Sequence, residues 1–298
     1  MPAMLWALTS YYNPAHYARR LANYRRFRAA LEVPLLTLEL GFDGRFELTA
    51  GDADVLLQIG RGDVMWQKER LLNVGLGHLP RQASGVLGID CDMIYAEAGW
   101  ARRIERALAT HTLVQAFSVV EHLGPSGAVL FAQPALAAQD DPAAALAQVT
   151  QRVAGSAAPG HAWAYRRDFI DRHGFFDRCI VGGGDTAMAG AACAALPAVI
   201  ALHGMNAAQA AHYRRWGQPL ARALGGSIGI VDERITHLWH GEFAARQARS
   251  RHALLTAHAF DPDTDLYLNA CGTWSWKSPK PALHSAVVDY FAARLEDA

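Results

Sequence analysis

The stretch GVLGIDCDMIY, residues 85–95, decides the expected fold. Its first part, Gly85 to Ile89, is apolar and predicts a buried strand. Two acids, Asp90 and Asp92, follow that strand directly. Ligands of open α/β sheets bind at the carboxyl ends of the strands, so the two aspartates stand where a ligand site is expected.

The chain before this stretch alternates between strand and helix patterns. Apolar runs predict strands at residues 4–10, 33–40 and 53–59. One helix is predicted after Asn13, as its N-cap, with Pro14 in the first helical position. Residues 66–76 have helical spacing and predict a second. This alternation predicts a doubly wound α/β sheet over the first ~90 residues.

The chain after this stretch is less regular. A surface helix is predicted at residues 142–154, an amphipathic helix at 206–224 ended by Gly225-Gly226, and a strand at 228–235. The tail from Trp274 is expected to end in a helix. Its inward-facing residues are predicted to be Val287, Val288, Phe291 and Leu295.

Composition limits the class of protein. The 298 residues are 51% hydrophobic, and Lys+Arg and Asp+Glu are both 28, which argues against a general nucleic-acid binder. The four cysteines form no C-x-x-C pair and are expected to be reduced thiols. The start of the chain does not have the pattern of a signal peptide, and no run approaches the roughly 20 apolar residues of a membrane span. We expect a soluble cytoplasmic enzyme, with peripheral contact to the inner face of the membrane through its substrate.

The aspartate pair predicts a divalent metal site. In an extended segment the carboxylates of Asp90 and Asp92 point the same way, and they repel one another unless a cation lies between them. Mg²⁺ and Mn²⁺ prefer such oxygen ligands. The alternative is a pair of solvated loop acids.

Two further motifs carry polar groups toward the same edge of the sheet. WQKERLLNVGL, residues 66–76, supplies Lys68 and Asn73, although solvated helix residues would show the same pattern. RRDFIDRHGFFDRCIVGGGDTAMAG, residues 166–190, places three glycines before Asp185, which lets backbone approach a ligand and exposes the carboxylate. A phosphate loop is the alternative, but the G-K-[ST] ending is missing.

The fourth motif is RITHLWHG, residues 234–241. In an extended segment His237 and His240 face opposite sides, so they need not bind one metal together. A single histidine would complete a two-aspartate site for Mn²⁺. Hydrogen-bonded packing is the alternative for each imidazole.

In this order the four motifs resemble the GT-A glycosyltransferases. Within them, the chain is similar to the β-1,4-galactosyltransferase and polypeptide N-acetylgalactosaminyltransferase group over residues 5 to about 245. WQKERLLNVGL resembles the segment before that group's metal strand, IDCDMIY its D-x-D strand end, FIDRHGFFD…VGGGD its "…NGF…GGED" acceptor stretch, and THLWHG its late histidine. Gly184 stands where the galactosyltransferases carry Glu, so their acceptor preference is not implied.

The resemblance implies a single GT-A domain, a Rossmann-like mixed central sheet flanked by helices. Residues 1–123 would bind the nucleotide sugar, residues 160–245 would supply the acceptor side and late metal ligand, and residues 246–298 would form an extension. It implies a UDP-sugar donor, a glycan or other hydroxyl acceptor, and Mn²⁺ or Mg²⁺.

The resemblance also implies roles for individual residues. Asp185 would be the general base of an inverting transfer. The other expected roles are these: Asp90, Asp92 and His237 as metal ligands; Glu39, Lys68, Asn73, Asp90 and His240 as donor-binding residues; Trp163, Gly183 and Gly184 as acceptor-binding residues.

Two other classes remain open from the residues. A nucleotidyltransferase acting on sugar phosphates also uses a Rossmann-like sheet with paired acids. It would usually carry a glycine-rich basic loop after the first strand, where this chain has SYYNPAHYARR. A non-catalytic nucleotide-sugar-binding protein would keep the fold without turnover.

Overall fold

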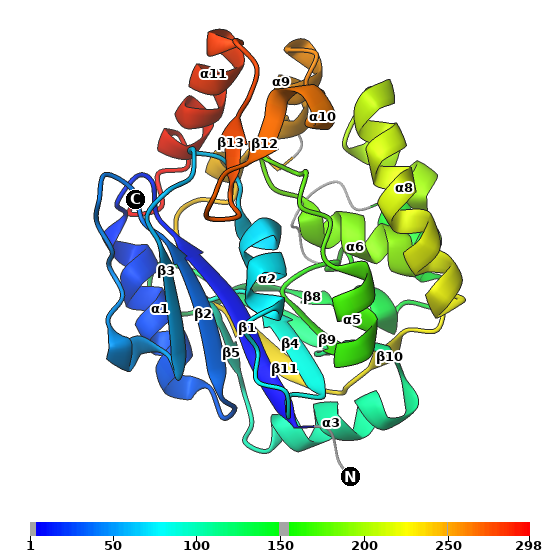
Figure 1. The fold of residues 1–298 in the computed structure, drawn as a ribbon. Helices are drawn as coiled ribbons and strands as arrows, with labels where there is room; N and C mark the ends of the chain where they lie inside the picture. The colour runs from blue at the N-terminus through cyan, green and yellow to red at the C-terminus, as the bar shows by residue number, and fades with distance from the viewer. Residues whose placement is uncertain (1–3, 149–154, 249) are drawn as a thin grey trace.

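The computed structural model describes residues 4–148, 155–248 and 250–298. Its main sheet has the order β10-β6-β9-β4-β1-β2-β3 (Figure 1). The strands are β1 (Leu5–Tyr12), β2 (Leu35–Leu40), β3 (Val55–Ile59), β4 (Gly85–Ile89), β6 (Leu113–Gln115), β9 (Ala162–Arg166) and β10 (Gly229–Ile230). Neighbours run parallel except at β9, which is antiparallel to β4 and β6. The predicted mixed α/β sheet is confirmed, and β9 joins both halves of the chain into one domain.

Two smaller sheets complete the β structure. One has the order β5-β11-β7-β8, and the other pairs β12 with β13. These strands are β5 (Met93–Tyr95), β7 (Val119–Leu123), β8 (Val129–Pro134), β11 (Arg234–His237), β12 (Leu266–Leu268) and β13 (Trp274–Trp276).

Helices lie on both faces of the main sheet (Figure 1). The α-helices are α1 (Ala18–Ala30), α2 (Lys68–Leu76), α3 (Trp100–Thr110), α4 (Pro142–Ala147), α5 (Arg167–His173), α6 (Gly184–Ala192), α7 (Leu196–Leu202), α8 (Ala207–Leu224), α9 (Arg251–Ala257), α10 (Pro262–Asp265) and α11 (Pro281–Ala292). Short 3₁₀ turns are η1 (Ala50–Asp52), η2 (Leu136–Ala138) and η3 (Ala244–Arg246). Among the described residues, no helix is long and apolar enough to cross a bilayer.

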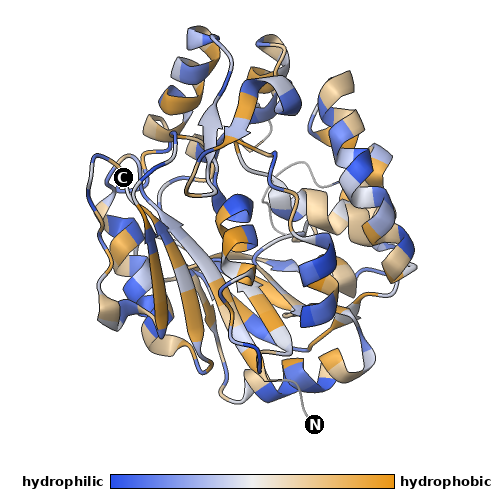
Figure 2. Cartoon of the chain, viewed as in Figure 1, coloured by the Kyte–Doolittle hydropathy of each residue, from blue (hydrophilic) through white to orange (hydrophobic). Residues whose placement is uncertain are grey.

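The sheet separates two hydrophobic cores. Side chains alternate along β1, so Trp6 and Leu8 join the core beneath α2, while Leu5 and Ala7 join the core beneath α1 and α3. Burial on both faces explains the nearly continuous apolar runs in the strands (Figure 2). At Gly75 an added Cβ would lie 2.5 Å from Leu38 Cδ1, so glycine lets α2 pack closely on the sheet.

Most of the elements that the sequence predicts are present in the structure. The strands expected at residues 4–10, 33–40, 53–59 and 85–89 are present as β1 to β4, and the helix expected at residues 66–76 is α2. Helix α8 is capped by Asn206, which exchanges side-chain and backbone hydrogen bonds with Gln209, and ends at Gly225 with φ 57°. The four cysteines are free, as expected.

The start of α1 differs from the prediction. The helix begins at Ala18 with Tyr17 as N-cap, not at Pro14. The Asn13 side chain accepts from the Tyr17 backbone N–H at 2.9 Å and donates to Glu47 at 3.0 Å. These bonds hold residues 13–17 as a connecting turn, so the helix starts later.

Two later segments also differ. Helix α4 ends at Ala147, and residues 149–154 of the predicted 142–154 helix lie outside the described residues. The strand predicted at residues 228–235 is two strands, because β10 pairs with β6 while β11 pairs with β5 and β7 in another sheet.

The predicted inward face of the last helix is half wrong. Val287 and Phe291 are buried, but Val288 is 45% exposed and Leu295 57% exposed. Val288 follows Val287 and so projects about 100° further around the helix. Leu295 lies beyond the end of α11, with φ 46°.

Candidate active site

One carboxylate and two imidazoles meet where β4 leads into β5. Asp92 directly precedes β5, which pairs antiparallel with β11 so that Met93 is opposite His237. The Leu238 N–H donates to the Asp92 carbonyl at 2.9 Å. This pairing brings the end of β11, with His237 and His240, beside Asp92.

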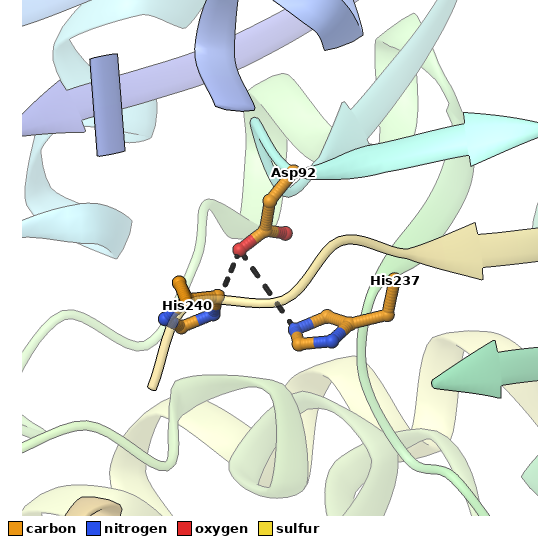
Figure 3. A group of neighbouring side chains, drawn as sticks. All are labelled: Asp92, His237 and His240. Atoms are coloured by element: carbon orange, nitrogen blue, oxygen red, sulfur yellow. Dashed lines mark ion pairs between the residues drawn. The ribbon is translucent and has the colours of Figure 1, made fainter. Parts of the chain in front are cut away.

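The three side chains have the geometry of a metal-binding group. Asp92 Oδ2 lies 3.0 Å from His240 Nε2 and 3.8 Å from His237 Nε2 (Figure 3). One ligand atom from each residue lies within 4.8 Å of the others. Among the described residues, nothing hydrogen-bonds Asp92 Oδ1, although it is buried. An orphaned carboxylate oxygen beside two imidazoles fits a divalent transition-metal ion such as Mn²⁺.

Both histidines approach Asp92, contrary to the expectation that they face opposite sides. That expectation assumed an extended segment, but β11 ends at His237 and the chain leaves the sheet before His240. The aspartates also do not lie in an extended segment. Asp90 and Asp92 flank a turn in which the Met93 N–H donates to the Asp90 carbonyl at 3.3 Å, so the two carboxylates meet different partners.

A buried carboxylate from the C-terminal segment lies behind His240. Glu296 is 1% exposed, and its Oε2 lies 3.6 Å from His240 Nδ1. Arg20 at 2.8 Å and Arg294 at 2.5 Å pair with Glu296. Burial alone would raise the pKa of Glu296, but these two cations hold it well below its ordinary value. Glu296 is therefore an anion behind His240, in the place from which a carboxylate supports the imidazole of a metal site.

Lys68 bridges Asp90 and Asp185. Its Nζ donates to Asp185 Oδ1 and Oδ2 at 2.9 and 3.0 Å and pairs with Asp90 Oδ1. Although burial lowers the pKa of Lys68, the two carboxylates raise it well above its ordinary value. For Asp90 the effects have the opposite sign. Burial raises its pKa, but Lys68 and His161 lower the pKa overall. The Lys68 side chain thus lies between the side chains of Asp90 and Asp185.

Glycines shape the turn that presents Asp185. Gly182 and Gly183 have φ of 91° and 100°, a region that favours glycine, and α6 begins at Gly184. An added Cβ at Gly184 would lie 2.1 Å from Glu69 Oε1, so the Glu69 side chain fills the space beside this glycine. Asp185 follows in the first turn of α6, where a carboxylate is favoured by the helix dipole.

The Glu69 carboxyl is buried beside this group. It is 4% exposed, and among the described residues nothing bonds its Oε1. Burial raises its pKa to about 8, with Lys68 opposing and Asp185 adding to the increase. Burial therefore favours the protonated, neutral form of Glu69 beside Lys68 and Asp185.

The metal-binding group, Lys68, Asp90 and Asp185 line one cavity of about 820 Å³. Its walls come from the ends of β1 and β4, the start of α2, the turn before α6, and the segments 237–248 and 250–252. The charged residues that line it are Arg20, Lys68, Asp90, Asp92, Asp185, Arg246, Arg251 and Arg294. A cavity of this size accommodates a nucleotide sugar or a molecule of similar bulk.

Four predicted site residues do not line the cavity as the structure describes it. Glu39 accepts hydrogen bonds from the backbone of residues 47 and 48 and from Gln58. Asn73 bonds the backbone of Phe175. Trp163 is 3% exposed and donates to the Pro159 carbonyl at 2.9 Å, and Gly184 packs against Glu69. Gly183, in contrast, lines the cavity.

Several residues near the site were not predicted from the sequence. His161 lies 3.8 Å from Asp90 Oδ2, and Arg246 lies 3.4 Å from His237 Nε2. His203, Arg251 and His252 also line the cavity. The only signal in the sequence is the concentration of basic residues in RQARSRH, residues 246–252, directly after the late histidines.

Comparison of the sequence with models of protein families, and with curated proteins, gives no match. Solved structures give distant similarities. Residues 1–349 of S. aureus TarS with UDP-GlcNAc match at 11% identity and a TM-score of 0.41, over 80% of this chain and 60% of that one. Glucosyl-3-phosphoglycerate synthase from Mycobacterium tuberculosis with Mn²⁺, UDP-glucose and phosphoglyceric acid matches at 14% and 0.44, over 92% and 86%. The 4-diphosphocytidyl-2C-methyl-D-erythritol synthase of Anaerococcus prevotii matches at 10% and 0.34, over 78% and 88%. These similarities are too distant to carry an argument about activity.

Proposed function

We propose that this protein is a metal-dependent GT-A glycosyltransferase that moves a sugar from a UDP-sugar to an acceptor hydroxyl with inversion. The observation that carries the proposal is the convergence of Asp92, His237 and His240 in the same cavity as Asp185 and Lys68. A divalent cation bound there would neutralise the departing diphosphate.

On the donor side, we assign Asp92, His237 and His240 to the metal. Asp90 and Lys68 would contact the donor. Lys68 is charged, and it can exchange a carboxylate partner for a phosphate oxygen of the donor, a charge-assisted contact of the same kind.

On the acceptor side, Asp185 is the proposed general base. Its carboxylate is 32% exposed, lies in the cavity wall, and is held by Lys68 at 2.9 Å. A hydroxyl that donates to this carboxylate would lose its proton to it as the oxygen attacks the anomeric carbon from the face opposite the leaving group.

The test measures UDP binding and donor turnover with and without metal. UDP binding by calorimetry is expected to require Mn²⁺ or Mg²⁺, and UDP-sugars are expected to release UDP slowly when water replaces the acceptor. Undiminished turnover in excess EDTA would refute the metal assignment. Release of pyrophosphate from a nucleoside triphosphate and a sugar phosphate would indicate a nucleotidyltransferase instead, and tight UDP binding without turnover on any donor would indicate a binding protein.

A further inference from the structure

The cavity carries more positive than negative charge. Five cationic side chains and three carboxylates line it. Most of the cations have partners: Arg20 and Arg294 pair with Glu296, and Lys68 pairs with Asp90 and Asp185. Arg251 differs, because no carboxylate within the described ranges pairs with it.

Arg251 lies on the Gly182–Gly183 side of the cavity. An added Cβ at Gly182 would be 3.0 Å from its Nη1, and the same Nη1 donates to the Tyr290 hydroxyl at 3.3 Å. Burial raises the pKa of Tyr290, but the positive charges of Arg294 and Arg251 beside its hydroxyl lower the pKa overall. The Arg251 Nε–H is buried without a hydrogen-bond partner among the described residues.

Two histidines stack beside the same turn. The ring centroids of His203 and His252 are 3.9 Å apart, with an interplanar angle of 12°. An added Cβ at Gly183 would lie 2.8 Å from His203 Cε1 and 2.9 Å from His252 Cε1. His203 is 4% exposed, and its Nδ1 has no partner among the described residues. Burial and Arg251 lower the pKa of His203 to about 3, so both rings are neutral.

We propose that Arg251, His203 and His252 form a subsite for an anionic group of the acceptor, a phosphate or a carboxylate. The subsite has an arginine without a carboxylate partner, a buried imidazole nitrogen without a partner, and the N-terminus of α6. All three features attract a multidentate oxyanion. The inference rests on the proposed function, because it gives the acceptor its position.

The subsite is built from residues other than those assigned to the donor and the metal. Gly182 and Gly183, which lie against Arg251 and the two histidines, stand three and two residues before Asp185 in the chain. The donor is assigned to other residues of the cavity, Asp90 and Lys68, and the metal to Asp92, His237 and His240. An anion held at Arg251 would therefore hold a neighbouring hydroxyl near the proposed base.

The test uses three small polyols of similar size: glycerol 1-phosphate, glycerate and glycerol. Each is titrated by calorimetry into the protein saturated with UDP and Mn²⁺, so that the donor site is already filled. Glycerol 1-phosphate or glycerate is expected to bind, and glycerol is not. The anionic probe that binds more tightly identifies the preferred anion as a phosphate or a carboxylate. Arg251→Gln is expected to weaken anion binding by about ten- to a hundredfold, the usual loss for a charge-assisted contact, and to leave UDP affinity unchanged.

Two further variants complete the test. Arg214→Gln, at an exposed position on α8, is the matched control and is expected to bind all probes as the wild type does. If Arg251→Gln does not fold, Arg251→Lys takes its place in the test. This variant keeps the charge and is expected to retain part of the anion affinity.

The inference is wrong if glycerol binds as well as the anions, or if Arg251→Gln keeps full anion affinity. It is also wrong if UDP affinity falls with anion affinity, because Arg251 would then belong to the donor site. A wild type that binds neither UDP nor Mn²⁺ would refute the proposed function instead, and anion titration of the unliganded protein would still test the subsite.

Discussion

Asp185→Asn changes the charge of one side chain and almost nothing of its shape. Both Asp185 oxygens now accept from Lys68 Nζ, at 2.9 and 3.0 Å. Asparagine keeps one acceptor and loses the negative charge. Because the side chain is 32% exposed, solvent screens the lost pair, and we expect a cost of about 1 kcal/mol in the free energy of unfolding.

The expected effect on turnover is much larger. Loss of a general base costs about 10²–10⁴-fold in rate, or roughly 3–5.5 kcal/mol in the activation barrier. Because the base acts only as attack proceeds, the affinity for UDP and Mn²⁺ should not change. A variant that folds, binds the donor and transfers sugar very slowly is therefore the expected result.

The assay measures single-turnover sugar transfer together with calorimetric UDP and Mn²⁺ binding. Asp177→Asn is the matched control. Asp177 accepts a hydrogen bond from Arg70 at 3.0 Å, and it does not line the cavity. We expect it to lose similar stability and to keep its turnover. If Asp185→Asn retains most of its turnover, the inverting assignment fails. If it loses Mn²⁺ binding, Asp185 belongs to the donor site.

Three other predictions follow from the same geometry. Asp92→Asn should weaken Mn²⁺ binding by at least about tenfold, and unchanged Mn²⁺ affinity by calorimetry would remove Asp92 from the metal site. Lys68→Met should weaken UDP binding by about ten- to a hundredfold. If a folded variant, judged by unchanged circular dichroism, binds UDP as tightly as the wild type, Lys68 only forms a structural ion pair. Burial raises the pKa of Glu69 from 4.5 to about 8, so the folded protein retains a proton that the unfolded chain releases. The free energy of unfolding should therefore fall by roughly 4 kcal/mol as pH rises from 4.5 to 8. Urea unfolding of Glu69→Gln should lack this slope, whereas the exposed control Glu97→Gln should keep it; equal slopes would contradict the prediction.

Hydrophobic patterns predicted strands β1 to β4 of the main sheet, but not β6 or β9. Runs such as residues 33–40 are buried on both faces, so their composition alone marks them as strands. The same reasoning located Asp92, because a ligand site is expected after a buried strand. It could not place His240, whose approach to Asp92 depends on where β11 leaves the sheet and on its register with β5. Register is a property of strand pairing, which no local pattern contains.

The acceptor side could be predicted least. Glu69 fills the space beside Gly184 because α2 and α6 pack together, and Arg251 reaches the Gly182 turn from a segment about seventy residues later. Such contacts depend on tertiary packing rather than on composition. Glu39 shows the opposite case: it is at the expected end of β2, but hydrogen bonds from Gln58 and the backbone use its carboxylate.

The arrangement behind His240 has a consequence for how the molecule folds. The proposed metal group comprises residues 92, 237 and 240, and the Glu296 carboxylate lies behind His240. Contacts between positions so far apart in sequence close long loops and form late, whereas β1 and β2 are neighbours in sequence and can pair early. Strands β1 and β2 can thus pair before the proposed cation site forms. Time-resolved Mn²⁺ binding during refolding would then follow the last step of folding, and intrinsic fluorescence would follow the earlier ones.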